Sequence, residues 1–233
     1  MAPENTLAAF RKAVEEGADM IELDVRMTKD FHLVVHHDQD VRRTTNGSGC
    51  IWEKTLLEVR MLDAGSWFSP RFRGEQIPTL RQVLEMLPPH VGVNIEAKTD
   101  GDRRKNIHME ESCILIILEK KFEDRTLVSS FDHTFLKRMH RFFPAIRTGA
   151  LYVPVRDLRK TPSSIARNIG TSVFACSVSQ LRKRFTEDAR KQDLTLACFT
   201  VNTHKDLRKV TRYGVDAVIT DYPGRVIGWL NAG

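Results

Sequence analysis

The 233-residue sequence predicts an α/β fold built on a parallel sheet, close to a (β/α) barrel. Two observations lead to this prediction. Short apolar strands alternate with helical patterns along most of the chain, and about seven such strands can be counted, one short of the eight that close a barrel. Strands joined by helices pair in parallel through right-handed crossovers. No linker or repeat divides the sequence, so one domain is expected over residues 1–233.

The first expected element is a short amphipathic helix. Residues 3–6 carry a helix-start signal, and Leu7, Phe10 and Val14 then recur at helical spacing. Gly17 supplies a stop signal. A barrel begins with a strand, so a helix in this position suggests that a strand precedes it.

The next expected element, over residues 19–26, is a strand that carries two acids. Its apolar residues, which share one face, are Ile21, Leu23 and Val25. Glu22 and Asp24 project from the other face, about 7 Å apart along the chain. On an inward face these carboxylates would repel each other unless a cation lay between them, and Mg²⁺ and Ca²⁺ prefer oxygen ligands. An isolated pair of this kind is more often an exposed acidic edge, so the pattern alone leaves both readings open.

Two histidines follow a short apolar run at residues 33–35. His37 could donate a proton to a leaving alkoxide, because an imidazole titrates near neutral pH. A lone histidine is more often structural. The segment that follows is expected to be a surface insertion over about residues 47–75, with one short helix around residues 56–62 and a loop with buried aromatic side chains at residues 65–70.

The rest of the chain alternates strands with helices. The expected strands cover residues 91–95, 126–129, 148–151, 172–175, 194–197 and 217–220. The expected helices cover residues 80–87, 104–120, 134–142, 158–168, 180–191 and 205–213. This alternation is typical of a parallel sheet with covered faces.

The strand over residues 91–95 leads into a second pair of charged residues. Glu96 and Lys98 share one face at its C-terminal end, and the active sites of α/β barrels lie on that rim. Glu96 could complete a three-carboxylate metal site with Glu22 and Asp24, and Lys98 could neutralise a phosphate oxygen. An ordinary surface ion pair is the alternative, but acids at matched positions on neighbouring strands favour the site.

Composition narrows the class of protein. The net charge of +6 favours anionic partners. The basic clusters at residues 42–43, 103–105 and 182–184 are not interleaved with aromatic side chains, so no nucleic-acid partner is expected. No stretch approaches the roughly 18 apolar residues of a membrane span, and no signal-peptide pattern opens the chain, which favours a cytoplasmic protein without membrane insertion. The four scattered cysteines are expected to be reduced thiols.

Several motifs occur together in an ordered series. They cover residues 2–10, 21–25, 37–38, 43–49, 62–68, 77–80, 94–98, 129–131, 200–202 and 214–223. In order and spacing, this series resembles the signature blocks of the glycerophosphodiester phosphodiesterase family. The resemblance extends over essentially the whole chain.

The resemblance implies a TIM-type (β/α) barrel with a small insertion after the second strand. It also implies hydrolysis of a small-molecule glycerophosphodiester to sn-glycerol 3-phosphate and an alcohol, with a divalent cation, Mg²⁺ or Ca²⁺, as cofactor. The residues that match the family by position are Glu22, Asp24 and Glu96 as metal ligands, His37 and Lys98 as catalytic residues, and Lys98, Phe131 and Phe199 as substrate-binding residues. Of the two adjacent histidines, the match places the catalytic role on His37.

The sequence departs from the family pattern in two places. Phe199 stands where the family usually has a tryptophan, a change that keeps an apolar wall. The His-Arg-Gly motif that precedes the block at residues 2–10 has no counterpart, so the first strand and its catalytic histidine are expected to be missing. The missing histidine keeps open the alternative of a catalytically impaired phosphodiester-binding homologue. A second alternative, from the same superfamily, is a phospholipase-D-like enzyme that acts on lysophospholipid with the same acids and histidine.

Overall fold

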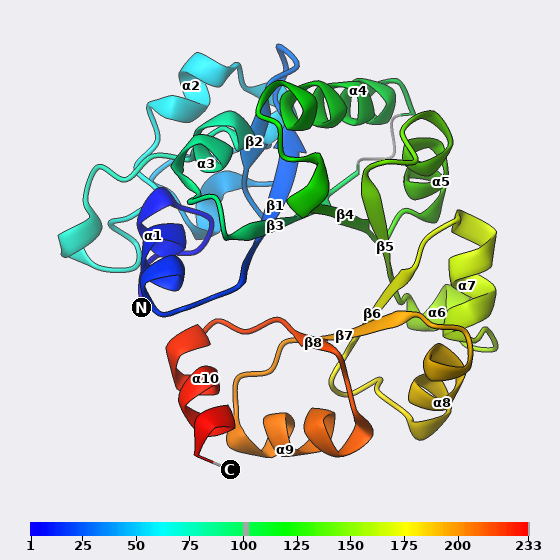
Figure 1. The fold of residues 1–233 in the computed structure, drawn as a ribbon. Coiled ribbons are helices and arrows are strands. Elements are labelled where there is room, and N and C mark those ends of the chain that lie inside the picture. Colours follow the sequence, from blue (N-terminus) through cyan, green and yellow to red (C-terminus); the bar gives the residue numbers. More distant parts are fainter. Residues whose placement is uncertain (100–102, 233) are drawn as a thin grey trace. The chain divides into compact units, whose positions relative to one another are not determined.

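The computed structural model describes residues 1–99 and 103–232. For residues 103–105 it describes the backbone but not the side chains. The basic cluster at residues 103–105 thus lies outside the described side chains. The chain divides into two compact units, Met1–Thr126 and Leu127–Gly233. Each unit is an α/β structure in its own right (Figure 1).

The first unit is built on a three-stranded sheet with β1 at its centre. Its strands are β1 (Met20–Met27), β2 (Leu33–Val35) and β3 (Gly92–Ala97). β1 runs parallel to β3, with Glu22 opposite Asn94 and Asp24 opposite Glu96. β2 returns antiparallel along the C-terminal half of β1. The apolar run at residues 33–35 is therefore a strand, although it is too short to show any period in the sequence.

The first unit has four described helices, and three of them begin at side-chain caps. The helices are α1 (Leu7–Glu15), α2 (Leu56–Arg60), α3 (Leu80–Met86) and α4 (Arg103–Glu119), with short 3₁₀ turns η1 (Val41–Arg43), η2 (Ile51–Glu53), η3 (Pro70–Phe72) and η4 (Glu123–Arg125). The hydroxyls of Thr6, Thr55 and Thr79 accept hydrogen bonds from backbone amides in the first turns of α1, α2 and α3. Such caps satisfy amide groups that a helix start leaves unpaired.

The insertion differs in part from its prediction. The expected short helix is present as α2, but the expected burial of the aromatic side chains is wrong, because Trp67 is 40% exposed. Its ring packs edge-on against Phe68, and its Nε1 donates a hydrogen bond to the carbonyl of Ala64. Aliphatic side chains form the buried core of this region instead, among them Ile51, Val59 and Ile77.

The second unit is a parallel sheet covered by helices. Its strands are β4 (Thr126–Ser130), β5 (Arg147–Leu151), β6 (Val173–Ser177), β7 (Thr195–Phe199) and β8 (Ala217–Val218), each parallel to its neighbours. Its helices are α5 (His133–Phe142), α6 (Pro154–Asp157), α7 (Pro162–Ile169), α8 (Lys183–Lys191), α9 (His204–Tyr213) and α10 (Pro223–Asn231). None of the helices described in the chain has the length and apolar character needed to cross a bilayer.

Three elements of the second unit depart from the sequence-based expectation. The helix expected from residue 158 begins at Pro162, because the Thr161 hydroxyl caps it and proline suits its first turn. The separate α6 precedes it, and α10 was not predicted. All seven expected strands are present in the described part of the chain. Within each unit the paired strands run parallel, except that β2, which was not among the seven, pairs antiparallel with β1. The strand expected to precede residue 1 stays a prediction.

The two faces of this second sheet have different roles. The ring of Phe174 on β6 packs against Phe185 of α8 and against Tyr152, with centroids 5.6 and 5.9 Å away, and the rings of Tyr152 and Phe185 are 5.3 Å apart. These rings join the sheet to its helices. The opposite face carries small and aliphatic side chains, Leu151, Ala175 and Ala197, with Phe199 packed against them.

Candidate active site

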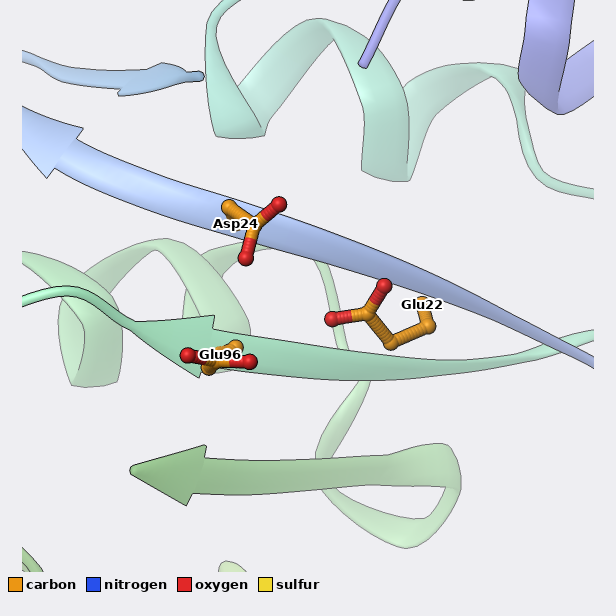
Figure 2. A group of neighbouring side chains, drawn as sticks. All are labelled: Glu22, Asp24 and Glu96. Atoms are coloured by element: carbon orange, nitrogen blue, oxygen red, sulfur yellow. The ribbon is translucent and has the colours of Figure 1, made fainter. Parts of the chain in front are cut away.

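Three carboxylates converge on one face of the neighbouring strands β1 and β3. Glu22 and Asp24 come from β1 and Glu96 comes from β3, and one ligand oxygen of each lies within 4.8 Å of the others (Figure 2). The parallel register places Asp24 directly opposite Glu96, and the alternation of a strand places Glu22 on the same face. The convergence expected from the sequence is therefore present in the structure.

Lys98 lies against two of these carboxylates. Its Nζ is 3.0 Å from Oδ1 of Asp24 and also pairs with Oε1 of Glu96. Burial alone would lower the Lys98 pKa, but the two neighbouring carboxylates outweigh it and the pKa is raised. Burial raises the pKa of Glu96, and the nearby Lys98 offsets this only in part. The lysine that was predicted to contact phosphate thus already neutralises part of the acidic cluster.

The donor set fits a hard divalent cation. All three candidate ligands offer carboxylate oxygens, which Mg²⁺ and Ca²⁺ prefer. If all three carboxylates are ionised, the ammonium of Lys98 leaves the cluster with a formal charge of −2, which one divalent ion balances. On the same face, the buried Oδ1 of Asn94 has no hydrogen-bond partner in the structure. A buried acceptor of this kind favours an additional polar group at the site.

The two adjacent histidines have different surroundings. His36 is buried, its Nε2 is 3.5 Å from the carbonyl of Asp40, and burial lowers its pKa. The side chain of His37 is about half exposed, and its Nδ1 is 2.7 Å from Oδ1 of Asp38. Burial raises the pKa of Glu96, and the charge of His37 has a smaller, opposite effect on that pKa. The His37 ring therefore acts electrostatically on the acidic cluster. The geometry therefore favours His37 over His36 as the proton-transfer group.

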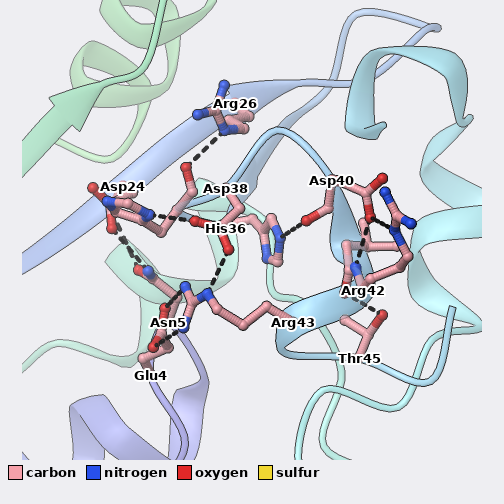
Figure 3. A network of polar contacts seen from close by, with 12 residues as sticks. Glu4, Asn5, Asp24, Arg26, His36, Asp38, Asp40, Arg42, Arg43 and Thr45 are labelled. Atoms are coloured by element: carbon pink, nitrogen blue, oxygen red, sulfur yellow. Dashed lines mark hydrogen bonds and ion pairs between the residues drawn. The ribbon is translucent and has the colours of Figure 1, made fainter. Parts of the chain in front are cut away.

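The segment before α1 contributes a residue, Asn5, that holds Asp24 in place and that the sequence did not identify as part of the site. Asn5 accepts a hydrogen bond from the amide of Asp24 at 3.3 Å, and its Nδ2 donates one to Oδ2 of Asp24 at 2.9 Å (Figure 3). Asn5 has a φ of 55°, in the left-handed region that asparagine tolerates better than most residues. The only signal in the sequence was the motif at residues 2–10, which was interpreted as a helix start and a family signature.

The two candidate substrate-binding aromatics lie in the second unit. The rings of Phe131 and Phe199 meet edge to face, with centroids 6.3 Å apart. Phe131 is partly exposed, and its carbonyl accepts a hydrogen bond from Nη1 of Arg156 at 2.8 Å. The two residues form one aromatic pair, and their contact with substrate stays a prediction.

A buried carboxylate anchors Arg156 and makes the second unit sensitive to acid. Burial alone would raise the Asp157 pKa, but hydrogen bonds from Arg156, the Val153 amide and Lys160 outweigh it and lower the pKa to about 2. The stabilisation is therefore complete above the ordinary aspartate pKa and is lost as the pH falls toward about 2. Asp157→Asn should lower the melting temperature near neutral pH and flatten its fall in acid. Thermal denaturation across this pH range tests the prediction, and an unchanged acid profile would contradict it.

The comparisons with known proteins agree over nearly the whole chain. The model of the glycerophosphoryl diester phosphodiesterase family matches residues 1–225. A glycerophosphodiester phosphodiesterase from Caldanaerobacter subterraneus subsp. tengcongensis is 39% identical over 232 residues, which cover 99% of this chain and 93% of that relative. Another from Bacillus altitudinis is 34% identical over 229 residues, which cover 97% of this chain and 91% of the relative.

Solved structures show the same fold. A phosphodiesterase from Oleispira antarctica, in complex with the product sn-glycerol-3-phosphate, matches with a TM-score of 0.91 at 27% identity, covering 99% of this chain and 92% of that one. A glycerophosphodiester phosphodiesterase from Agrobacterium tumefaciens matches with a TM-score of 0.83 at 30% identity, covering 98% of this chain and 94% of that one. These matches confirm the predicted TIM-type α/β fold class. The chain therefore belongs to the glycerophosphoryl diester phosphodiesterase family.

Proposed function

We propose that this protein hydrolyses glycerophosphodiesters to sn-glycerol 3-phosphate and an alcohol. The observation that carries the proposal is the cluster of three carboxylates within 4.8 Å, with Lys98 paired to two of them. The names of the relatives and the product bound in the Oleispira antarctica structure support the same reaction.

A divalent cation, Mg²⁺ or Ca²⁺, is the proposed cofactor, held by Glu22, Asp24 and Glu96. Such an ion supplies charge that stabilises a phosphate as it is attacked. Lys98 places an ammonium beside the same carboxylates, and its proposed role is to neutralise a phosphate oxygen of the bound substrate. The cluster and the lysine together would orient the phosphodiester and balance its charge.

His37 is the proposed general acid. Its Nδ1 contacts Asp38, so Nε2 is the ring nitrogen that remains to transfer a proton to the departing alkoxide. His36 is buried against the Asp40 carbonyl and takes no part in the proposed reaction. Phe131 and Phe199 are proposed to provide an apolar wall for the substrate.

Turnover of defined substrates tests the proposal. Purified protein with Mg²⁺ or Ca²⁺ should release sn-glycerol 3-phosphate from glycerophosphocholine and glycerophosphoethanolamine, as followed with a coupled glycerol-3-phosphate dehydrogenase. Binding of glycerol 3-phosphate without turnover would contradict the proposal and favour a phosphodiester-binding homologue. Faster release of choline from lysophosphatidylcholine than from glycerophosphocholine would favour a phospholipase-D-like activity.

A further inference from the structure

A chain of ion pairs links the segment before α1 to the ring of His37. Arg43 lies at its centre (Figure 3). Its Nη1 and Nη2 donate to the two carboxylate oxygens of Glu4 at 2.8 and 2.6 Å, and its Nε donates to Oδ2 of Asp38 at 2.5 Å. The other oxygen of Asp38, Oδ1, lies 2.7 Å from Nδ1 of His37.

This arrangement differs from an ordinary surface ion pair in its geometry. All four side chains are partly exposed, and an isolated exposed pair contributes little to stability. Here, however, both oxygens of Asp38 and all three guanidinium nitrogens of Arg43 are engaged, and a forked guanidinium fixes direction as well as charge. The backbone of His37 is held separately, because Nε of Arg26 donates to its carbonyl at 2.9 Å. Ring and backbone are therefore both restrained.

We propose that Asp38, held in place by Arg43 and Glu4, is a positioning residue that keeps the proton of the His37 ring on Nδ1 and leaves Nε2 for proton transfer. The effect on turnover rests on the proposed function, whereas the effect on the ring does not. The hydrogen bond from Arg43 lowers the Asp38 pKa to about 2, so the carboxylate accepts a hydrogen bond and does not donate one. A carboxylate at one ring nitrogen selects the tautomer and orients the other nitrogen.

The neighbouring ion pair supplies a matched control. Arg42 pairs with Asp40 through its Nε at 2.9 Å and is more exposed than Arg43. Both arginines belong to η1, so Arg42→Lys and Arg43→Lys make the same chemical change one residue apart. Only Arg43 contacts the carboxylate that reaches His37.

Nuclear magnetic resonance of the histidine rings tests the positioning role without any substrate. In ¹⁵N-labelled protein at alkaline pH, long-range proton–nitrogen correlations should show the neutral His37 ring protonated on Nδ1, with the assignment made from the His37→Gln spectrum. Asp38→Ala should shift the ring toward the Nε2-protonated tautomer, which free imidazole side chains prefer in water. A neutral ring protonated on Nε2 in the unmodified protein, or one unchanged by Asp38→Ala, would overturn the proposal.

A double-mutant cycle tests the consequence for catalysis. Asp38→Ala should lower kcat by about 10- to 100-fold with KM changed less than about twofold, because the residue acts through His37. Asp38→Asn, which retains an acceptor oxygen, should lose less. In a His37→Ala background, Asp38→Ala should cause no further loss.

Two further comparisons decide the outcome. Arg43→Lys should lower kcat by roughly 3- to 10-fold, because an ammonium cannot hold both carboxylates in the same fork, whereas Arg42→Lys should leave it unchanged. An equal loss for Asp38→Ala with and without His37, or equal kcat for the two lysine variants, would overturn the positioning role. If the unmodified protein hydrolyses no glycerophosphodiester, the proposed function fails, and the tautomer measurement still decides this inference.

Discussion

Glu22→Gln and Glu96→Gln are each expected to abolish measurable hydrolysis, with losses on the order of 10³-fold or more. Each change keeps the shape of the side chain but removes one of the three charged oxygen ligands that lie within 4.8 Å of one another. An excess of chelator should have the same effect, and added Mg²⁺ or Ca²⁺ should reverse it. The measurement is the release of sn-glycerol 3-phosphate from glycerophosphocholine.

The control for this prediction is an acid outside the cluster. Glu85 is exposed and pairs with Lys120, so Glu85→Gln should leave activity unchanged. The melting temperature supplies a second readout of cation binding. Mg²⁺ or Ca²⁺ should raise the melting temperature of the unmodified protein and of Glu85→Gln, and should raise that of Glu96→Gln much less. Full activity in excess chelator would contradict the metal assignment.

His37→Ala is expected to lower turnover by about 10² to 10⁴-fold while leaving substrate binding largely intact. A general acid contributes mainly in the transition state, so its loss should appear in kcat and much less in KM. Steady-state kinetics on glycerophosphocholine gives both values. A loss confined to KM would contradict the assigned role.

His36→Ala separates chemistry from stability. His36 is buried, so its removal should lower the melting temperature more than His37→Ala does, with a smaller effect on kcat. Because burial lowers the His36 pKa, the unfolded chain takes up this proton more readily than the folded one. The His36 contribution therefore makes stability fall as the pH drops below the ordinary histidine range, and His36→Ala should weaken that dependence. Equal losses of kcat from the two histidine variants would contradict the assignment.

The acidic cluster could be predicted from the sequence because strands have a fixed period. Glu22 and Asp24 share a face of β1 by alternation alone. Glu96 could be added to this pair because neighbouring parallel strands run to the same rim of a barrel. The observed register, with Asp24 opposite Glu96, agrees with this expectation. The pairing of Lys98 with Asp24 depended on the rotamer of a long side chain, which a sequence pattern does not define.

The contacts made by loops could not be predicted in this way. Glu4 and Arg43 are 39 residues apart, and no helix or strand period relates their positions. The exposure of Trp67 likewise depends on the path of the insertion, where the apolar core is supplied by residues such as Ile51 and Val59. In loops the backbone path decides which side chains meet, and composition carries little information about it.

The adjacency of Glu4 and Asn5 sets a distance in the candidate site. Asn5 holds the carboxylate of Asp24 on β1, whereas Glu4 holds Arg43 and, through it, the turn that bears His37. Their Cα atoms are separated by one peptide unit, about 3.8 Å, a length that thermal motion hardly changes. The peptide unit between Glu4 and Asn5 thus fixes the spacing between strand β1, which carries the acids, and the turn that carries His37. Inserting a single residue between Glu4 and Asn5 would lengthen this connection and move the acidic cluster and His37 apart, although every side chain involved would still be present.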